Sequence, residues 1–558
     1  MPEVQDQVAV RMYRGILGDC FLVTVAEKGE RRHILIDCGV LQSVISGDDM
    51  MLKLPQEVTR AIGEERLRKV QAGGAQIRRV AQDVSDYIKA NGGRIDLLVL
   101  THEHYDHLSG FALAWNVWSD AELKIDKLWL AWTEDPADAQ AKALYARFAK
   151  GKQALAYAAQ LADNDAFAMD DSLRDAAALA AFIGPVDAPG LPAAAVDPDN
   201  PKAPRTMNDV IQRMKAKVGP EGTRYLEPGQ VIDRSEGAGL KAYVLAPPRA
   251  QERLDRDLPG SKEKNTIYLT GHDEAAAVAS AARAQLRMAG MLGADSGGAA
   301  LPAAELSQDS VPFARPHRRP YPAEDYSSES EDRAKLRLAY EDKAEEVRRI
   351  DGDWTAAAGA LALKMDSDTN NTSLVLAFEL PDGRVLLFPG DAQVGNWESW
   401  GDQTYPSAKF RKEGDSPSQT IDEILRRVVF YKVGHHASHN ATLRTRGLEL
   451  MTDPRLSAAI PVVEAVAAVQ GPGKKVPGKG WKMPYGHLHK ELQHRTEGRI
   501  VQGDGDPEAE RQAFAARDAG VSIAHEDPAT GGLWVELSFP LNPAPGGAAA
   551  GVRRGQPA

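Results

Sequence analysis

Hydrophobic and polar residues alternate in short runs near the N-terminus, as they do in half-buried β-strands. The runs are VAVRMYRG (8–15), CFLVTVAEKG (20–29) and HILIDCG (33–39). RIDLLVL (94–100) is a continuous apolar run that ends abruptly in a polar cluster, which is typical of a buried strand. With KLWLAW (127–132), these runs predict a strand-rich block over residues 7–132.

The strand pattern returns late in the chain, over residues 372–436. It holds the runs SLVLAFEL (373–380), RVLLFPGD (384–391) and RRVVFYKVG (426–434). Between the two blocks lies one further strand-like run, GLKAYVLAPP (239–248). Two strand-rich blocks separated by helical material predict an α/β layered fold.

Apolar residues recur at helical spacing in the intervening segments. We expect helices over about 55–91, 136–183, 274–291 and 331–349. The stretch between 250 and 365 is rich in Gly, Pro and Ser, so we expect it to be partly flexible. The predicted organisation is one domain over residues 1–540, with helical insertions at about 41–92 and 136–365 and a disordered tail over 541–558.

Composition excludes several classes of protein. The chain has 558 residues, 43% of them hydrophobic, and a net charge of -12, which argues against a chain-wide basic surface for nucleic acid or anionic membranes. No apolar run reaches the roughly 20 residues of a membrane span, and no signal peptide is visible, so we expect a cytoplasmic protein. Cys20 and Cys38 fall in apolar runs and are predicted to be buried thiols.

The strongest chemical signal is Thr101-His102-Glu103-His104-Tyr105-Asp106-His107, which directly follows the apolar run 94–100. Buried imidazoles and carboxylates are costly without partners, and a divalent metal supplies one. In an extended loop His102 and His104 point to the same side and can chelate one ion. Asp106 and His107 follow and can bind a second ion nearby. The alternative is a solvated polar loop, which this density of ligands disfavours.

This motif resembles the HxHxDH motif of the metallo-β-lactamase superfamily, and other blocks follow in the same order. GDCFLV (18–23) and ILIDCG (34–39) resemble the first strands of that fold. NNTSLVLAFE (370–379) and VLLFPGDA (385–392) resemble its later strand pair. YKVGHHASHN (431–440) and GHLHKELQHR (486–495) resemble the competence-protein (ComEC-type) branch. The resemblance implies an αββα sandwich with the helical segments as insertions.

The resemblance also implies roles for individual residues. His102 and His104 would bind one metal, Asp106 and His107 the second, and Asp391 would bridge the two. One of His435 and His436 would complete the second site. Asp106 and Asp391 would also position the attacking hydroxide. Asp37 and Asp19 would orient ligands through hydrogen bonds, and His487 and His489 would line the pocket.

The chain departs from the family pattern at two points. Ala437 stands where Gly is typical, which is expected to tighten the loop. Many members have a third histidine for the first metal. Here only His272 and His317 lie in the corresponding interval, outside strand context, and we expect neither to be a ligand.

The resemblance therefore implies a hydrolase with two divalent metal ions, zinc first and manganese or iron as alternatives. Phosphodiester bonds are the favoured substrate, in a nucleic acid, a nucleotide or a phospholipid headgroup. Two alternatives stay open: hydrolysis of amide, lactone or peptide bonds, and a non-catalytic binding or regulatory module. Protein partners are possible, but the sequence identifies none.

Overall fold

The computed structural model describes residues 6–41, 73–162, 171–256, 331–341, 353–406, 418–470, 480–516, 520–527 and 532–541. Residues 192, 194, 198 and 441 are gaps within these ranges, and between 42 and 72 only isolated residues are described. The expected helix at 274–291, His272, His317 and the tail beyond 541 lie outside the described residues.

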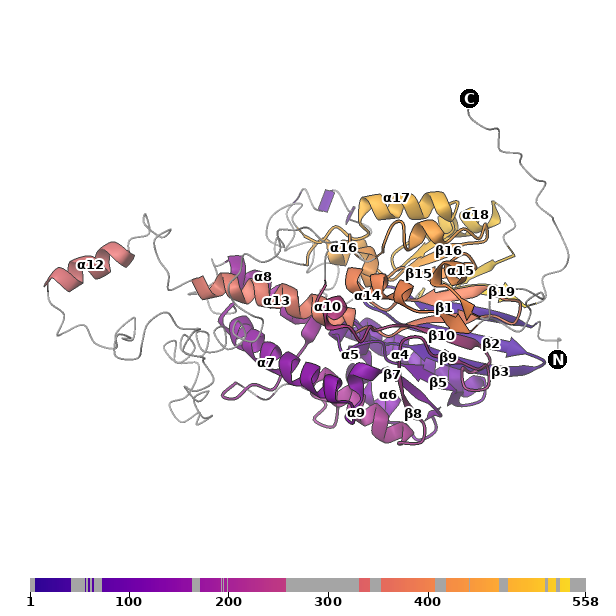
Figure 1. Cartoon of the computed structure of the whole chain (residues 1–558), viewed down its shortest axis with the longest axis horizontal. Helices are drawn as coiled ribbons and strands as arrows, with labels where there is room; N and C mark the ends of the chain where they lie inside the picture. Colours follow the sequence, from indigo (N-terminus) through magenta and orange to yellow (C-terminus); the bar gives the residue numbers. More distant parts are fainter. Residues whose placement is uncertain are drawn as a thin grey trace, which may run out of the picture.

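Two β-sheets pack face to face and form the centre of the molecule (Figure 1). The first has the strand order β18-β19-β1-β2-β3-β5-β7-β8. Its strands are β1 (Gln7–Tyr13), β2 (Phe21–Glu27), β3 (Glu30–Ile36), β5 (Leu97–Val99), β7 (Leu128–Ala131), β8 (Thr223–Leu226), β18 (Ser522–His525) and β19 (Trp534–Pro540). The strands from β3 to β8 are parallel and the others are antiparallel.

The second sheet has the order β17-β16-β15-β12-β11-β10-β9. Its strands are β9 (Val231–Ile232), β10 (Lys241–Ala246), β11 (Val375–Glu379), β12 (Val385–Phe388), β15 (Val428–Lys432), β16 (Ser457–Ile460) and β17 (Ile500–Gln502). The strands from β12 to β17 are parallel, because helical segments connect them, whereas β9 to β12 are antiparallel. Two small sheets join β4 (Arg94–Ile95) to β6 (Lys124–Ile125), and β13 (Tyr405–Pro406) to β14 (Ser418–Gln419).

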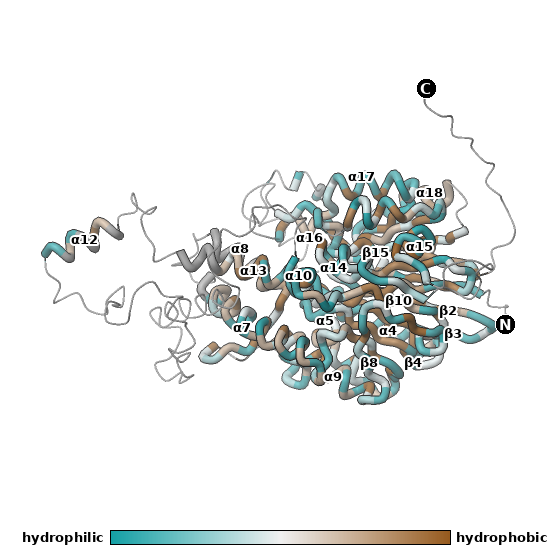
Figure 2. The backbone as a smooth tube through the Cα atoms, viewed as in Figure 1, coloured by the Kyte–Doolittle hydropathy of each residue, from teal (hydrophilic) through white to brown (hydrophobic). Residues whose placement is uncertain are grey.

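Helices cover both outer faces of the sandwich. On the first sheet lie α4 (Gly73–Ala90), α5 (Tyr105–Leu113), α6 (Trp115–Trp118) and α9 (Met207–Val218). On the second lie α14 (Val394–Ser399), α15 (Ile421–Leu425), α16 (Glu464–Ala467) and α17 (Gly486–Arg495), with α18 (Pro507–Ala515) beside β17 and β18. In Figure 2 hydrophobic residues concentrate along the strands, and helix α17 carries hydrophilic residues on its outer side. The αββα layering confirms the predicted fold class.

A helical bundle extends from one end of the sandwich (Figure 1). It consists of α7 (Ala139–Ala162), α8 (Asp171–Ile183) and α13 (Asp353–Asn371), which share a small hydrophobic core. The short α10 (Gln251–Leu254) and the charged α12 (Glu331–Glu341) belong to the same stretch of chain. The bundle lies mostly within the predicted insertion at 136–365, but β8, β9 and β10 of the same range are strands of the two sheets, and α13 runs on to residue 371 and leads directly into β11. Helix α5 ends at Leu113 and α6 starts at Trp115.

The end of β3 and the start of α5 touch through their backbones. A Cβ on Gly39 would lie 2.3 Å from the carbonyl carbon of Asp106, so only glycine fits. The backbone N–H of Cys38 donates to His107 O (2.8 Å), and that of Asp19 donates to Asp106 O (3.0 Å). These bonds fix the first turn of α5 against the first sheet. Cys20 and Cys38 are free and buried, as predicted.

None of the helices among the described residues is long and apolar enough to cross a membrane.

Candidate metal centre

The motif 101–107 forms an extended loop and the first turn of α5. β5 is wholly buried, and the chain stays extended through His104, where φ is -107° and ψ is 154°. The rings of His102 and His104 lie 4.7 Å apart between centroids, on the same side of the loop. Asp106 and His107 follow in the first helical turn, where a carboxylate also interacts favourably with the helix dipole. All four side chains are at least 97% buried.

Residues from the second sheet complete the cluster. Asp391 lies just after β12, and His436 lies after β15, in the 3-10 turn His435–Ala437. Asp391 Oδ2 is 3.2 Å from His107 Nε2 and 3.6 Å from His436 Nε2. His436 Nε2 is also 2.7 Å from Asp106 Oδ2. Parallel strands therefore bring groups more than 300 residues apart to one edge of the sandwich, where the chain leaves the carboxyl ends of β5, β12 and β15.

Several polar atoms in this cluster have no hydrogen-bond partner among the described residues. They are Nε2 of His102, His104 and His107, and Oδ1 of Asp106. A buried polar atom without a partner costs about 1–3 kcal/mol, so four of them at one place indicate a missing binding partner. Imidazole nitrogens and carboxylate oxygens are the donor set of zinc and similar divalent ions. His107 belongs, with Asp19, Asp391 and His436, to a group of buried side chains that could hold such an ion.

The charge states suit metal binding. Burial lowers the pKa of His102 well below its usual value and that of His104 to about 3, so both imidazoles are neutral, as a ligand must be. Burial also lowers the pKa of His107, but the nearby carboxylates, Asp391 first among them, outweigh this effect and raise it well above its usual value. His107 therefore sits in a strongly negative field, which a divalent cation would neutralise.

Asp37, at the end of β3, orients His107. Its Oδ2 is 2.8 Å from His107 Nδ1 and accepts a bond of 2.6 Å from the Thr101 hydroxyl, while its Oδ1 accepts the Thr101 backbone N–H at 2.8 Å. The bond at Nδ1 leaves Nε2 of His107 facing the cluster. His436 is oriented in the same way, because its Nδ1 is 2.9 Å from the carbonyl oxygen of Pro461.

Asp19 lies on the Nδ1 side of the His107 and His436 rings. Asp19, His107, Asp391 and His436 offer ligand atoms that all lie within 4.8 Å of one another. However, Asp19 is nearest to the Nδ1 atoms, 3.8 Å from that of His107 and 3.9 Å from that of His436. Both of those atoms already have partners, so the open side of the imidazoles is the Nε2 side, where Asp106 and Asp391 lie.

Lys432 lies beneath the cluster and is almost completely buried. Its ammonium donates to Asp19 Oδ2 (2.5 Å), Asp391 Oδ1 (3.0 Å) and Gly390 O (2.8 Å). Burial disfavours the charged form, but the two carboxylates outweigh it and the pKa of Lys432 is raised. Lys432 is thus a fixed positive charge that occupies one oxygen of Asp391 and leaves Oδ2 free.

Replacing Lys432 with Met is expected to destabilise the metal-free protein by about 3–5 kcal/mol, because Asp19 and Asp391 then lie buried without a counter-ion. Zinc should restore part of this loss, since an added cation takes over the neutralisation. Chemical denaturation with and without zinc measures both quantities. A loss that zinc leaves unchanged would show that Lys432 acts independently of the cluster.

His435 and His436 point to different surroundings. His436 faces Asp106 and Asp391, whereas the His435 ring lies near Ser438 Oγ (2.8 Å), Gln393 Nε2 and Asn370 Nδ2 (both 3.5 Å). His435 contacts the cluster only through its backbone N–H, which donates to Asp391 Oδ1 at 3.0 Å. Of the two histidines left open by the sequence, the structure brings His436 to the cluster.

The backbone explains this division. Residues 435, 436 and 437 all have positive φ, of 42°, 50° and 60°. Such left-handed backbone is unfavourable for residues other than glycine. Ala437 therefore has a strained backbone conformation, whereas the sequence led us to expect only a tighter loop. This turn rotates two adjacent histidines in different directions.

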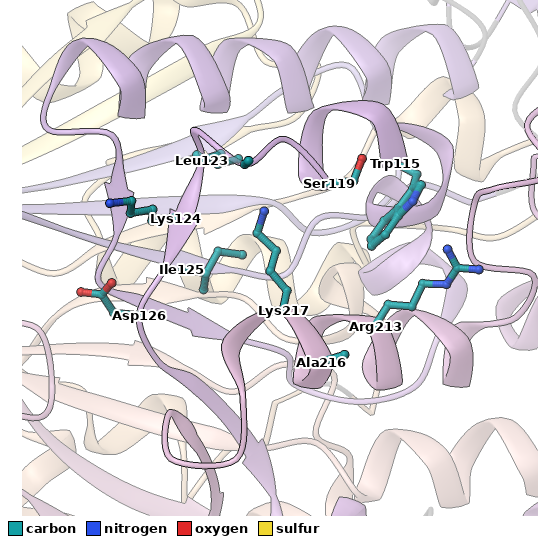
Figure 3. A pocket seen from close by; sticks show the side chains of 10 residues that line it. Trp115, Ser119, Leu123, Lys124, Ile125, Asp126, Arg213, Ala216 and Lys217 are labelled. Atoms are coloured by element: carbon teal, nitrogen blue, oxygen red, sulfur yellow. The ribbon is translucent and has the colours of Figure 1, made fainter.

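Two cavities among the described residues lie outside this cluster. One, of about 220 Å³, is lined by Glu103, Tyr145, Lys152 and residues of the α8–α9 segment, and Lys152 Nζ pairs there with Glu103 at 2.8 Å. Because Glu103 lies between His102 and His104, this contact links the insertion to the loop of the motif 101–107. Figure 3 shows the other, of about 750 Å³, between Trp115, Lys124 and the end of α9. None of its lining residues belongs to the cluster.

His487 and His489 do not join the cluster. His487 is exposed at the start of α17, where its ring lies 5.6 Å from that of Tyr485. Tyr485 in turn donates its backbone N–H to Ala437 O (2.8 Å), so His487 is connected to the histidine turn only through neighbours. His489 is half-buried on the same helix.

The sequence analysis missed Lys432 and a set of polar residues on α13. Lys432 could have been noticed as the one charged residue of the run VVFYKVG. Asp366 and Asn370 are spaced as neighbours on one face of α13, and both are buried. The Ala-rich sequence before them gave no sign that this face turns toward the metal cluster.

Comparison with known families agrees with this geometry. Residues 14–240 match the family model described as Metallo-beta-lactamase superfamily. The matched span contains Asp37 and the whole motif 101–107, whereas Asp391 and His436 come from the sheet block that follows it. No curated protein and no solved structure matches the chain.

Proposed function

We propose that this protein, which carries a metallo-β-lactamase superfamily domain at residues 14–240, is a hydrolase that activates water with two divalent metal ions and cleaves phosphodiester bonds. The observation that supports this most is the group of unpartnered, buried Nε2 and carboxylate oxygen atoms around Asp391. We favour zinc, with manganese or iron as alternatives.

In this proposal each side chain has a defined task. His102 and His104 would hold the first ion, and Asp106, His107 and His436 would hold the second. Asp391 would serve both sites through Oδ2, which lies near His107 and His436, while Lys432 holds its other oxygen. Asp37 keeps His107 in the orientation that presents Nε2. When bound, such ions lower the pKa of coordinated water to about 7 and polarise the oxygen of the scissile bond.

The first site has fewer protein ligands than the second. The His107 ring lies 4.2 Å from that of His102 between centroids, but we assign His107 to the second ion. No further histidine is assigned to the first ion, and His272 and His317 lie outside the described residues. We therefore expect the first ion to bind more weakly than the second.

The preference for phosphodiesters rests on sequence blocks that resemble the ComEC-type branch, YKVGHHASHN and GHLHKELQHR. Hydrolysis of amide, lactone or peptide bonds uses the same cluster and is the first alternative. A non-catalytic binding module is the second, although four buried ligand atoms without partners are costly to keep in a site that has lost its function.

The deciding experiment measures metal content by mass spectrometry on protein purified without chelator. About two ions per chain are expected, and a chelator should remove them and lower the melting temperature until zinc is returned. The loaded protein is then assayed on bis(4-nitrophenyl) phosphate, a homoserine lactone and a casein-derived peptide. Protein that stays metal-free after reconstitution would contradict the proposal, and cleavage of the lactone or peptide alone would move the activity to the first alternative.

A further inference from the structure

The C-terminal part of α13 is a run of polar residues that are nearly all buried. Asp366, Asp368, Asn370 and Asn371 are each at most 7% exposed. Most of this run is internally paired. Asp368 pairs with Arg147 and Lys364, and both ends of the Asn371 side chain are bonded to backbone groups. Two members differ, because Asp366 Oδ1 and Asn370 Oδ1 have no partner among the described residues.

These two residues face the metal cluster. They are one helical turn apart, and Asn370 Nδ2 is 3.2 Å from Asp366 Oδ2. Asn370 Nδ2 is also 3.5 Å from His435 Nε2, and Gln393 Nε2 is 3.5 Å from the other ring nitrogen of His435. The carboxyl group of Asp366 interacts electrostatically with Asp106, Asp391 and His436.

Gln393 has the same unusual property as its two neighbours. It is 1% exposed, and its Oε1 has no partner among the described residues. Asn370 and Gln393 therefore lie at the two ring nitrogens of His435, and Asp366 lies beside Asn370, each with one unpartnered oxygen. The amide ends that face His435 present their N–H groups, so the free atoms of these two amides are oxygens, which accept hydrogen bonds.

We propose that Asp366, Asn370 and Gln393 form a substrate subsite that binds a hydrogen-bond donor, a hydroxyl or amino group, on the part of the substrate next to the scissile bond. The inference rests on the proposed function, because it places this group beside the metal-activated water.

The subsite also suggests a function for the inserted bundle, which is to supply residues that contact the substrate. α13 packs against α7 and α8 and then leads directly into β11, so the insertion supplies one wall of the reaction centre. Buried acceptors that stay unpaired in the free protein reject a substrate that lacks the matching donor, because binding such a substrate leaves them unpaired in a dry site.

The test compares three zinc-loaded forms of the full chain: wild type and the variants Asp366→Asn and Asp368→Asn. The last is the matched control, since Asp368 lies on the same helix, is equally buried and is fully paired. The probes are the 4-nitrophenyl esters of butyl, 3-hydroxypropyl and 3-aminopropyl phosphate, which share a leaving group and differ in one terminal atom.

Wild type is expected to prefer the hydroxyl or the amino probe over the butyl probe by about tenfold in kcat/KM. Whichever of the two is preferred identifies the donor. Asp366→Asn should reduce this preference to below about threefold and leave the metal content unchanged, whereas Asp368→Asn should keep the preference. An Asp366→Asn variant that keeps the preference, or that loses activity equally on all three probes, would overturn the subsite.

A second readout does not depend on activity. A residue that serves binding lacks hydrogen-bond partners in the free protein. Asp366→Asn should therefore leave the melting temperature unchanged or raise it, while Asp368→Asn should lower it. If wild type cleaves none of the three esters, the phosphodiester proposal fails. The subsite is then tested by the melting temperatures of the two variants alone. A fall for Asp366→Asn as large as that for Asp368→Asn would show a structural role and overturn the inference.

Discussion

Replacing Asp391 with Ala is expected to remove at least one metal ion per chain and to lower kcat/KM by about a thousandfold or more. Asp391 Oδ2 is the carboxylate atom that lies near both His107 and His436, so its loss weakens the second site and removes the only contact proposed to join the two sites. A thousandfold loss corresponds to about 4 kcal/mol of transition-state stabilisation, which is in the range of a metal's contribution. Metal analysis and steady-state kinetics on the same preparation check both effects.

The control for this variant tests the effect of the unpaired charge on Lys432. In Asp391→Ala, Lys432 loses one of the two carboxylates with which it pairs. The double variant Asp391→Ala, Lys432→Met removes the unpaired charge as well, and its stability should lie closer to that of wild type than the sum of the two single changes predicts. It should nevertheless remain inactive. Recovery of activity in the double variant would show that Asp391→Ala acts through misplaced charge rather than through loss of a ligand.

Replacing His436 with Ala and His435 with Ala should give clearly different results. His436→Ala is expected to lose the second metal and to lower kcat/KM by about a thousandfold, because its Nε2 faces Asp106 and Asp391. His435→Ala is expected to keep both ions, because its ring faces Ser438, Gln393 and Asn370 instead.

The two variants form a matched pair, since they alter neighbouring residues in the same strained turn. Metal content measured by mass spectrometry separates a ligand from a neighbour, and thermal melting of the metal-free proteins shows whether both still fold. Equal metal loss in both variants would mean that the turn itself, rather than the His436 side chain, holds the second ion.

Much of the fold was predictable because its signals are local. The strands β1 to β3, β5, β7, β11, β12 and β15 each correspond to an apolar run of the sequence, and burial of those runs requires two packed sheets with helices outside. The insertion was predicted as helical for the same reason. Its last helix, α13, was not predicted, because its polar C-terminal turn is typical of a surface loop and only packing against the cluster explains why it is buried.

The motif His102 to His107 was also accessible from the sequence alone. Six consecutive residues after a buried strand must stay within a few ångströms of one another whatever the rest of the chain does, so their convergence follows from covalent spacing. The role of Asp37 came instead from the family resemblance, and the structure places it at the end of β3, the strand beside β5.

The remaining groups were decided by tertiary structure. Lys432, Asp366 and Gln393 come from three separate segments, and their convergence depends on the order of strands in the second sheet and on how α13 packs. The choice between His435 and His436 depends on three successive left-handed residues, whose side-chain directions differ even though the residues are adjacent. A sequence specifies which side chains carry chemistry, but the direction of each side chain and its partners from distant segments are set only when the two sheets and the inserted bundle pack together.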